Sequence, residues 1–436
     1  MTDDRAVSCA QKRLWILDRL DAGSTAYVVP LLHWIDGDLD VGLLARSLTE
    51  IVRRHEVLRT VYRLRSRTVR QVVRPAEEVR VPVVDVRGHK DPRTEAERLA
   101  AAEARRPFDL SAGPMLRVLL VRMSADRHLL CLTFHHIACD GWSMSVLHHE
   151  LSACYRSWSA GGSPVLPPLR EQYADFAEAQ QTRLAGPLLQ AERRYWRERL
   201  SALPASVTVP ADRPREPVPT FAGTHVRFAV DPPVARRVEG LARAARATPF
   251  AVFLATLAAL TRVEGGGPEA VIGTPVSNRR SEDHHRLVGM FVNTVVQRLE
   301  VPAELTFREL VHRARDEIRA ALAHADLPFE MLVEELNPVR RPGVNPLFQI
   351  MLGYQDGEPA GLVLPGCTTS TEYGDTSTAK LDLSLSVHRA AGRYSVRLEC
   401  RSDLYGPASV RRLAERFRAL LATATADPRI TVAGLH

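Results

Sequence analysis

Two adjacent histidines, His135 and His136, are the residues of this sequence best suited to acid–base chemistry. They follow the apolar run 129–134, which is typical of a β-strand, and they precede Asp140-Gly141, a pair typical of a tight turn. An imidazole has an ordinary pKa of about 6.5 and can therefore exchange a proton near neutral pH. Because adjacent side chains on extended backbone point in opposite directions, we expect only one histidine to face a given cleft.

Three other interpretations of this stretch compete with acid–base chemistry. In the first, Asp140 only closes the turn and both histidines are satisfied core residues. In the second, a metal is bound by ligand-type residues of this region, namely His135, His136, Asp140, His148, His149 and Glu150. The spacing H-E-x-x-H is absent, so we predict no metal site. In the third, Cys139 is a nucleophile, although a small residue filling the loop is the simpler hypothesis.

Transfer of an acyl group to an amine or alcohol is the reaction class that a histidine base suits. The nucleophile must lose its proton near neutral pH, which imidazole can accept. If the acyl donor is a thioester, the enzyme needs no covalent intermediate, only positioning and stabilisation of the tetrahedral charge. The motifs G-x-S-x-G, G-x-x-x-x-G-K-[ST] and G-x-G-x-x-G are absent, which argues against hydrolase-elbow, P-loop and dinucleotide sites.

Length and composition predict a cytoplasmic protein with two lobes. The 436 residues exceed the size of one typical core, and 45% apolar with 25% charged residues is usual for a globular chain. No apolar run is long enough for a membrane span, and the N-terminus lacks the order of a signal peptide. The six cysteines are dispersed, so we expect reduced thiols. The net charge of +7 comes from arginines dispersed among acidic residues, which disfavours a nucleic-acid interface.

Strand-like and helix-like segments alternate throughout, which predicts a mixed α/β fold. Ser8 and Gln11 form a capping box at the start of a helix, and Ser143 is the predicted N-cap of the helix after the histidines. The proline-rich stretch 204–219 is predicted to be a connector without regular structure. We expect strands near 28–35, 60–64, 69–73, 115–121, 128–134, 270–275, 347–354, 381–387 and 395–400, of which 60–64 and 69–73 form a hairpin and the last two are joined around 391–392. We expect helices near 9–20, 41–55, 144–158, 249–260 and 407–421, a helical zone over 173–200, and a capping box at 305–309.

Residues 135–141, H-H-I-A-C-D-G, match the HHxxxDG signature of condensation domains of nonribosomal peptide synthetases, which are acyltransferases of the chloramphenicol acetyltransferase-like superfamily. Further segments resemble the other motifs of this family, in the same order and over almost the whole chain. These segments are 8–15, 54–60, 173–177, 272–279, 288–294, 324–330 and 345–349.

The resemblance implies two chloramphenicol acetyltransferase-like lobes in a V-shaped pseudo-dimer, which we place at residues 1–175 and 176–436. It implies a tunnel entered from opposite faces by substrates on the 4'-phosphopantetheine arms of a donor and an acceptor carrier protein. The protein itself would bind no cofactor and would be a monomer. The expected reaction joins a carrier-bound acyl or aminoacyl thioester to the amine of an aminoacyl-carrier, which forms an amide.

The same resemblance implies a catalytic motif made of His135, His136, Asp140 and Gly141. His136 would act on the nucleophile, as a general base or as a positioning group, and Gly141 would line the acceptor side. Asp140 would form a structural ion pair with Arg279, since a buried pair fixes a loop and breaking it costs about 3–5 kcal/mol. Trp142, Ser143 and Asn293 are further candidates for the tunnel wall.

Differences between this sequence and the motifs of related branches of the family narrow the reaction that we expect. His135 is not Asp, which argues against the heterocyclising branch, and His136 is not Arg, which argues against the oxygenase-recruiting branch. The segment 140–144 lacks the Val-Ser-Trp continuation of epimerising relatives, and the opening motif resembles the branch that accepts an L-configured donor. Two alternatives stay open: a free-standing enzyme that forms an ester with a small alcohol, and a non-catalytic scaffold that binds carriers.

Overall fold

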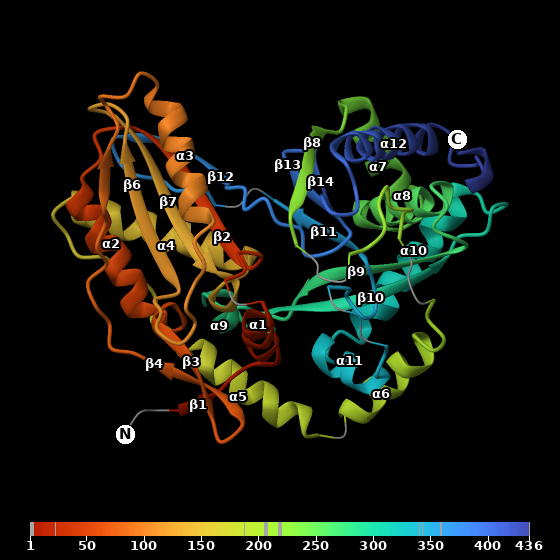
Figure 1. The fold of residues 1–436 in the computed structure, drawn as a ribbon, viewed down its shortest axis with the longest axis horizontal. Coiled ribbons are helices and arrows are strands. Elements are labelled where there is room, and N and C mark those ends of the chain that lie inside the picture. The colour runs from red at the N-terminus through yellow and green to blue at the C-terminus, as the bar shows by residue number, and fades with distance from the viewer. Residues whose placement is uncertain are drawn as a thin grey trace. The chain divides into compact units, whose positions relative to one another are not determined.

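The computed structural model describes residues 4–21, 23–186, 188–204, 208–216, 220–339, 341, 343–357 and 360–435. The chain divides into two compact units, each assembled from three separate stretches of sequence. Unit 1 comprises Met1–Gly186, Asn278–Val292 and Pro359–Thr376, and unit 2 comprises Pro187–Ser277, Asn293–Glu358 and Ser377–His436. Each unit contains a main β-sheet with helices, so the predicted mixed α/β class is confirmed (Figure 1).

The main sheet of unit 1 has five strands, and the strand that carries the histidines is in its centre. The strand order is β12 (Cys367–Tyr373), β2 (Val28–Gly37), β7 (Arg127–His135), β6 (Leu116–Arg122) and β5 (Val83–Asp85). β7 is antiparallel to both β2 and β6, and every residue of β7 after Arg127 is buried. A separate three-stranded sheet has the order β1 (Asp4–Ala6), β4 (Thr68–Val73) and β3 (Thr60–Arg65).

The core of unit 1 is built from all three of its sequence stretches. Leu132 and Phe134 of β7 belong to one buried apolar cluster with Val288 and Phe291 from the second stretch and Leu364 from the third. The α-helices of the unit are α1 (Cys9–Leu20), α2 (Val41–Arg54), α3 (Pro92–Ala104), α4 (Gly141–Ser159), α5 (Tyr173–Leu184) and α9 (Glu282–His285), and the short 3-10 helices are η1 (Glu56–Arg59) and η2 (His136–Ala138).

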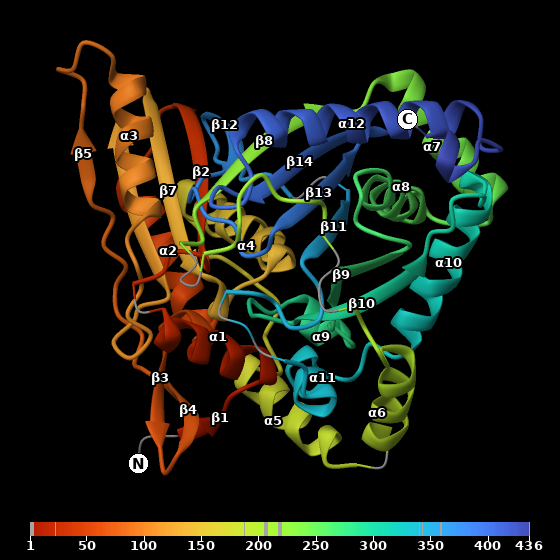
Figure 2. The same cartoon turned by 45° about the vertical axis from the view of Figure 1, so that its right-hand side comes forward.

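Unit 2 has a six-stranded sheet, and its core includes one helix that is buried along most of its length. The strand order is β10 (Val292–Glu300), β9 (Glu269–Ser277), β11 (Ile350–Asp356), β13 (Leu383–Ala390), β14 (Arg393–Arg401) and β8 (Gly223–Ala229). Residues Ala251 to Thr261 of α8 (Pro249–Val263) are all buried. The remaining helices of the unit are α6 (Leu188–Arg199), α7 (Pro232–Ala244), α10 (Phe307–Ala323), α11 (Phe329–Leu336), α12 (Pro407–Ala426) and η3 (Val432–Gly434). Figure 2 shows α12 lying along this sheet.

Local sequence signals placed most of the predicted elements within a few residues of where they occur. The 60–64 and 69–73 hairpin is confirmed as β3 and β4, and Ser66 and Arg67 at its turn have φ of 46° and 64°. The hairpin at Ala391-Gly392 is likewise confirmed as β13 and β14. The described part of the proline-rich connector, 204 and 208–216, contains neither helix nor strand, as predicted, while 205–207 and 217–219 lie outside the described residues.

The compact units do not coincide with the predicted lobes. Residues 176–186 belong to the first unit, and so do two later stretches, Asn278–Val292 and Pro359–Thr376. The V-shaped arrangement of lobes concerns the relative placement of the units and stays a prediction. Among the described residues no single helix is long and apolar enough to cross a membrane, although the bent pair α7 and α8 passes the same test by length and composition.

Candidate active site

The first histidine, His135, is the last residue of β7 and fixes the turn that follows. Its Nδ1 accepts a hydrogen bond from the Ile137 backbone N–H at 3.1 Å, and its ring meets the edge of Phe108 with centroids 5.8 Å apart. The residue is only 4% exposed. Because its ring is buried and hydrogen-bonded to the backbone of η2, His135 stabilises the conformation of the loop.

The second histidine, His136, is the first residue of η2 and is partly exposed. Its backbone N–H donates to the Tyr27 carbonyl at 2.8 Å, which ties the loop to the chain just before β2, and its Nδ1 atom is buried. One histidine is therefore buried and its neighbour is partly exposed, and the expectation that only one of them faces a substrate cleft stays a prediction.

Cys139 is buried within the loop, at 1% exposure. Its thiol lies 3.7 Å from the His135 carbonyl oxygen, to which it can donate a weak hydrogen bond, and its backbone N–H donates to the His136 carbonyl at 3.3 Å. A reactive thiolate needs access to substrate and an electropositive surrounding. The buried position of Cys139 supports the hypothesis that it fills the loop.

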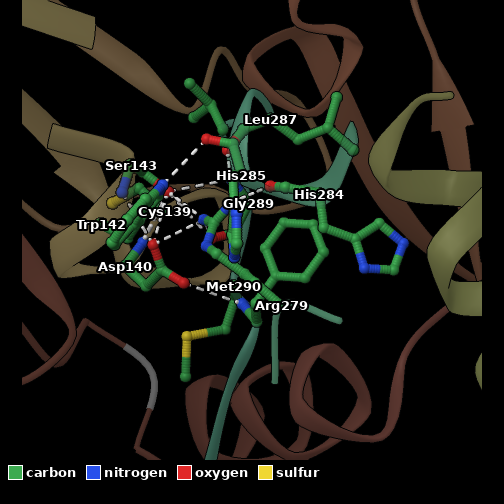
Figure 3. Close-up of polar contacts among 12 residues, drawn as sticks. Cys139, Asp140, Trp142, Ser143, Arg279, His284, His285, Leu287, Gly289 and Met290 are labelled. Carbon is green, nitrogen blue, oxygen red and sulfur yellow. Dashed lines mark hydrogen bonds and ion pairs between the residues drawn. The ribbon is translucent and has the colours of Figure 1, made fainter. Parts of the chain in front are cut away.

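Asp140 is the N-cap of α4, and its carboxylate is the centre of the polar contacts in Figure 3. Oδ1 accepts the Ser143 N–H at 2.9 Å and an Arg279 Nη2–H at 2.8 Å, and Oδ2 accepts the Phe291 N–H at 3.1 Å. The prediction that Ser143 caps this helix was wrong. Ser143 is the third residue of the helix, and its hydroxyl accepts the Asp140 N–H to complete a capping box.

Arg279, from the second stretch of unit 1, forms the predicted ion pair with Asp140. Its side chain is fully buried. Its Nη1 donates to the carbonyls of His284 and, at 2.7 Å, Leu287, and its guanidinium carbon lies 4.0 Å from the centre of the Phe291 ring. Desolvation lowers the pKa of Arg279, and the charge of Asp140 acts in the opposite direction. The guanidinium thus joins the histidine loop to the stretch 284–291 (Figure 3).

Gly289 in this stretch fits only because it has no side chain. A Cβ there would lie 2.1 Å from the Cδ2 atom of Tyr173, which is buried beneath it. The Gly289 N–H donates to the Ser143 hydroxyl at 3.0 Å, and the Tyr173 hydroxyl donates to the Met290 carbonyl at 2.6 Å. Burial raises the pKa of Tyr173 well above its ordinary value, so its hydroxyl remains a donor.

A second buried polar cluster, missed by the sequence analysis, also holds this stretch. His55 Nε2 and Glu150 Oε2 are 2.7 Å apart, and Glu150 Oε1 accepts from Arg54 Nε at 2.9 Å. His55 Nδ1 accepts the Val288 N–H at 3.4 Å. Although burial alone would raise it, the pKa of Glu150 is lowered by His55 and Arg54. The sequence shows polar and charged residues among the apolar positions of the helical segments α2 and α4, but it does not indicate which of them are in contact.

The three predicted tunnel residues and Gly141 have different surroundings. Trp142 is 49% exposed, and its indole N–H donates to the His285 carbonyl at 2.8 Å, whereas Ser143 is fully buried. A Cβ on Gly141 would meet no atom within 4 Å. Asn293 belongs to unit 2, where its amide donates to the carbonyls of Ala325 and Leu327 and accepts from the Phe329 N–H. Their place in a tunnel wall stays a prediction.

These contacts produce a partly exposed imidazole on a loop that is fixed on both sides. β7 ends in the buried His135, and α4 begins at the buried carboxylate of Asp140, with His136 between them. Such a group can accept, donate or orient a proton with little reorganisation. Among the described residues, no cluster of three or more histidine, cysteine or acidic side chains is arranged to hold a metal ion.

Known proteins resemble this chain over nearly its whole length. The chain is 39% identical to chondramide synthase cmdD of Chondromyces crocatus over 97% of its own length and 11% of that protein, and 39% identical to phosphinothricin tripeptide synthetase PhsB of Streptomyces viridochromogenes over 94% and 35%. It therefore corresponds to about a tenth to a third of these relatives.

Solved structures share the fold. The X-domain from teicoplanin biosynthesis is 28% identical with a TM-score of 0.91, covering 100% of this chain and 98% of that one. The first condensation domain of the calcium-dependent antibiotic synthetase, in complex with a substrate analogue, has a TM-score of 0.83 at 23% identity, over 99% and 98%. The sequence model of the condensation domain family matches residues 1–435. The chain belongs to the condensation domain family.

Proposed function

We propose that this chain joins the acyl group of a carrier-bound thioester to the amine of an aminoacyl group on a second carrier. The observation that carries the proposal is His136, partly exposed on a loop fixed by the Asp140–Arg279 pair, in a member of the condensation domain family. Both substrates would arrive on 4'-phosphopantetheine arms of donor and acceptor carrier proteins, and the chain would supply no cofactor of its own.

In the proposed reaction the acceptor nitrogen attacks the thioester carbonyl. A C–N bond forms, the C–S bond breaks, and the thiolate of the donor arm leaves. The amine loses one proton in this exchange and the leaving thiolate gains one. His136 would hold the amine in place and accept or relay that proton, because it is the member of the histidine pair that reaches solvent. Asp140 and Arg279 would act on the loop rather than on substrate, since both side chains are buried.

Replacing His136 tests this assignment. We expect His136→Ala to lower turnover about 100-fold or more in an assay with an acyl-loaded donor carrier and an aminoacyl-loaded acceptor carrier, followed by mass spectrometry of the acceptor. The melting temperature should stay close to that of the parent, because the ring is partly exposed. The control His89→Ala removes an exposed histidine from a loop and should leave turnover unchanged.

The same assay distinguishes the products. An amide on the acceptor arm supports the proposal, whereas transfer only to a small alcohol would identify an ester-forming enzyme. Undiminished turnover of His136→Ala would remove this histidine from the mechanism. Absence of any transfer, together with measurable binding of carriers, would favour a scaffold.

A further inference from the structure

Unit 2 carries a pocket that contains three arginine side chains and is separate in sequence from the histidine loop. Its volume is about 560 Å³. It is an open hollow whose lining residues come from α7, the first turn of α10, the end of α12 and Pro428. The lining residues are Pro233, Arg236, Arg237, Gly240, Leu241, Ala244, Arg308, Thr425 and Pro428.

Among the described residues, the three arginines of this arginine pocket, Arg236, Arg237 and Arg308, have no ion-pair partner, so their charges are not directly paired. Arg236 and Arg308 are exposed, and Nε of Arg237 is buried without a hydrogen-bond partner. Because three arginines line one hollow, an anion that enters there would be favoured on charge alone.

The acidic residues closest in sequence to the pocket are all bound elsewhere. Asp231 pairs with Arg418, Glu239 with Arg389 and Tyr394, and Asp427 with Arg429. Glu309, next to Arg308, accepts from the Thr306 N–H and hydroxyl in a capping box. These four carboxylates thus have contacts with residues other than the three arginines.

The rest of the lining indicates what kind of anion would bind. Pro233, Leu241, Ala244 and Pro428 add apolar surface between the arginines, and a Cβ on Gly240 would meet no atom within 4 Å, so the α7 face is open there. The Thr425 hydroxyl donates to the Leu421 carbonyl at 2.6 Å within its own helix. A free phosphate would use the arginines but none of the apolar surface. A protein segment with acidic and apolar side chains would use both.

We propose that the arginine pocket docks an acidic, amphipathic segment of a partner domain or protein. Each guanidinium presents a planar pair of donors that matches a carboxylate. The relatives are consistent with a protein occupant, since the matching part of chondramide synthase or of the phosphinothricin synthetase is joined to other parts of a much longer chain. This proposal is independent of the role given to His136.

The test measures binding of a defined acidic probe to the full chain. The probe is a fluorescein-labelled helical peptide of 16 residues with Glu and Leu on opposite faces, and its matched control has Gln in place of every Glu. Fluorescence anisotropy is recorded with the parent, with the triple variant Arg236→Gln/Arg237→Gln/Arg308→Gln, and with a control triple variant Arg63→Gln/Arg393→Gln/Arg411→Gln. The control residues are exposed arginines outside the pocket, so both triple variants lose the same charge.

We expect the Glu peptide to bind the parent, the pocket variant to weaken binding about tenfold or more, and the control variant to change it less than about twofold. The Gln peptide should not bind. Equal weakening by both triple variants would reduce the effect to net charge and overturn the proposal, as would absence of binding. Competition by millimolar inorganic phosphate that the pocket variant abolishes, without pocket-dependent peptide binding, would instead identify a small-anion site.

Discussion

At the scale of single residues, the site is organised around one buried carboxylate. Asp140 accepts hydrogen bonds from Ser143, Arg279 and Phe291, which belong to two stretches far apart in the sequence. A buried carboxylate without such donors would be costly, and each donor here removes part of that cost. The catalytic proposal for His136 depends on this arrangement, because the loop that carries the imidazole ends at Asp140.

Removing one partner of the ion pair should destabilise the protein more than removing both. We expect Asp140→Ala or Arg279→Ala to lower the free energy of unfolding by about 3–5 kcal/mol, since each leaves a buried charge without its partner. The double variant Asp140→Leu/Arg279→Met should lose less free energy of unfolding than either single variant, because it leaves neither charge buried without its partner. Urea unfolding of the four proteins gives this comparison, and additive losses would show that the pair is not coupled.

Two glycines should respond in opposite directions to the same substitution. At Gly289 an added Cβ meets the Tyr173 ring, so we expect Gly289→Ala to cost about 1–3 kcal/mol or more of unfolding free energy. Gly240 is inside helix α7 with open space around it, and Gly240→Ala should stabilise by about 0.5–1 kcal/mol. Thermal unfolding of the parent and of both variants measures these changes in stability. Equal effects of the two substitutions would contradict the close contact at Gly289.

At the scale of elements, β2, α4 and β12 meet at two buried histidines. His33 of β2 lies 2.9 Å, measured from Nδ1, from the hydroxyl oxygen of Thr371 on β12, and the ring centroid of His33 is 5.0 Å from that of His148 on α4. Burial and the neighbouring His148 lower the pKa of His33 to about 3, and burial lowers that of His148 as well. Both rings are therefore neutral in the folded protein at neutral pH.

This pair should make the protein less stable in mild acid. In the unfolded chain a histidine titrates near pH 6.5, so between about pH 6.5 and 3 the unfolded state binds more protons than the folded state. The contribution of His33 is then complete above that window, and stability falls as the pH drops through it, by about 1.4 kcal/mol per pH unit. Urea unfolding at several pH values should show a slope that His33→Leu reduces and His89→Ala leaves unchanged. An unaltered slope in His33→Leu would contradict the assigned pKa.

Elements with a strong local pattern were predictable from the sequence, and those defined by distant partners were not. Apolar runs such as 128–134 predicted β7, whereas β12, with the sequence Cys-Thr-Thr-Ser-Thr-Glu-Tyr, has little apolar character and owes its strand to pairing with β2. At the site, side-chain alternation predicted only that one of His135 and His136 faces a given cleft. The Asp140–Arg279 pair came only from the family motif, and nothing in the sequence pairs His55 with Glu150.

At the scale of the whole molecule, the sequence order and the spatial order differ. Unit 1 includes the stretches Asn278–Val292 and Pro359–Thr376 from the second half of the chain. Phe291 and Leu364, which lie in these stretches, belong to the core of unit 1. β12, the edge of its main sheet, comes from the last of these stretches. A cut at any single position therefore separates parts of one core.

An isolated N-terminal fragment should not fold as the intact unit does. We expect residues 1–186 alone to lack a cooperative thermal transition and to bind a dye for exposed apolar surface, because the fragment lacks Arg279, Phe291 and Leu364. The intact chain, with its larger and complete core, is the control and should unfold cooperatively. A sharp calorimetric transition of the fragment would show that Asn278–Val292 and Pro359–Thr376 are not needed for it to fold cooperatively.

The Asp140–Arg279 contact also sets an order of events during synthesis. The two residues are 139 positions apart, and a ribosome adding about 5–20 residues per second needs roughly 7–28 s to travel from one codon to the other. Throughout that interval the nascent chain carries the histidines and Asp140 but not the arginine that completes their surroundings. The loop can thus reach its final form only after most of the chain has been translated, so slow codons or chaperone binding downstream of residue 140 would affect the yield of active protein.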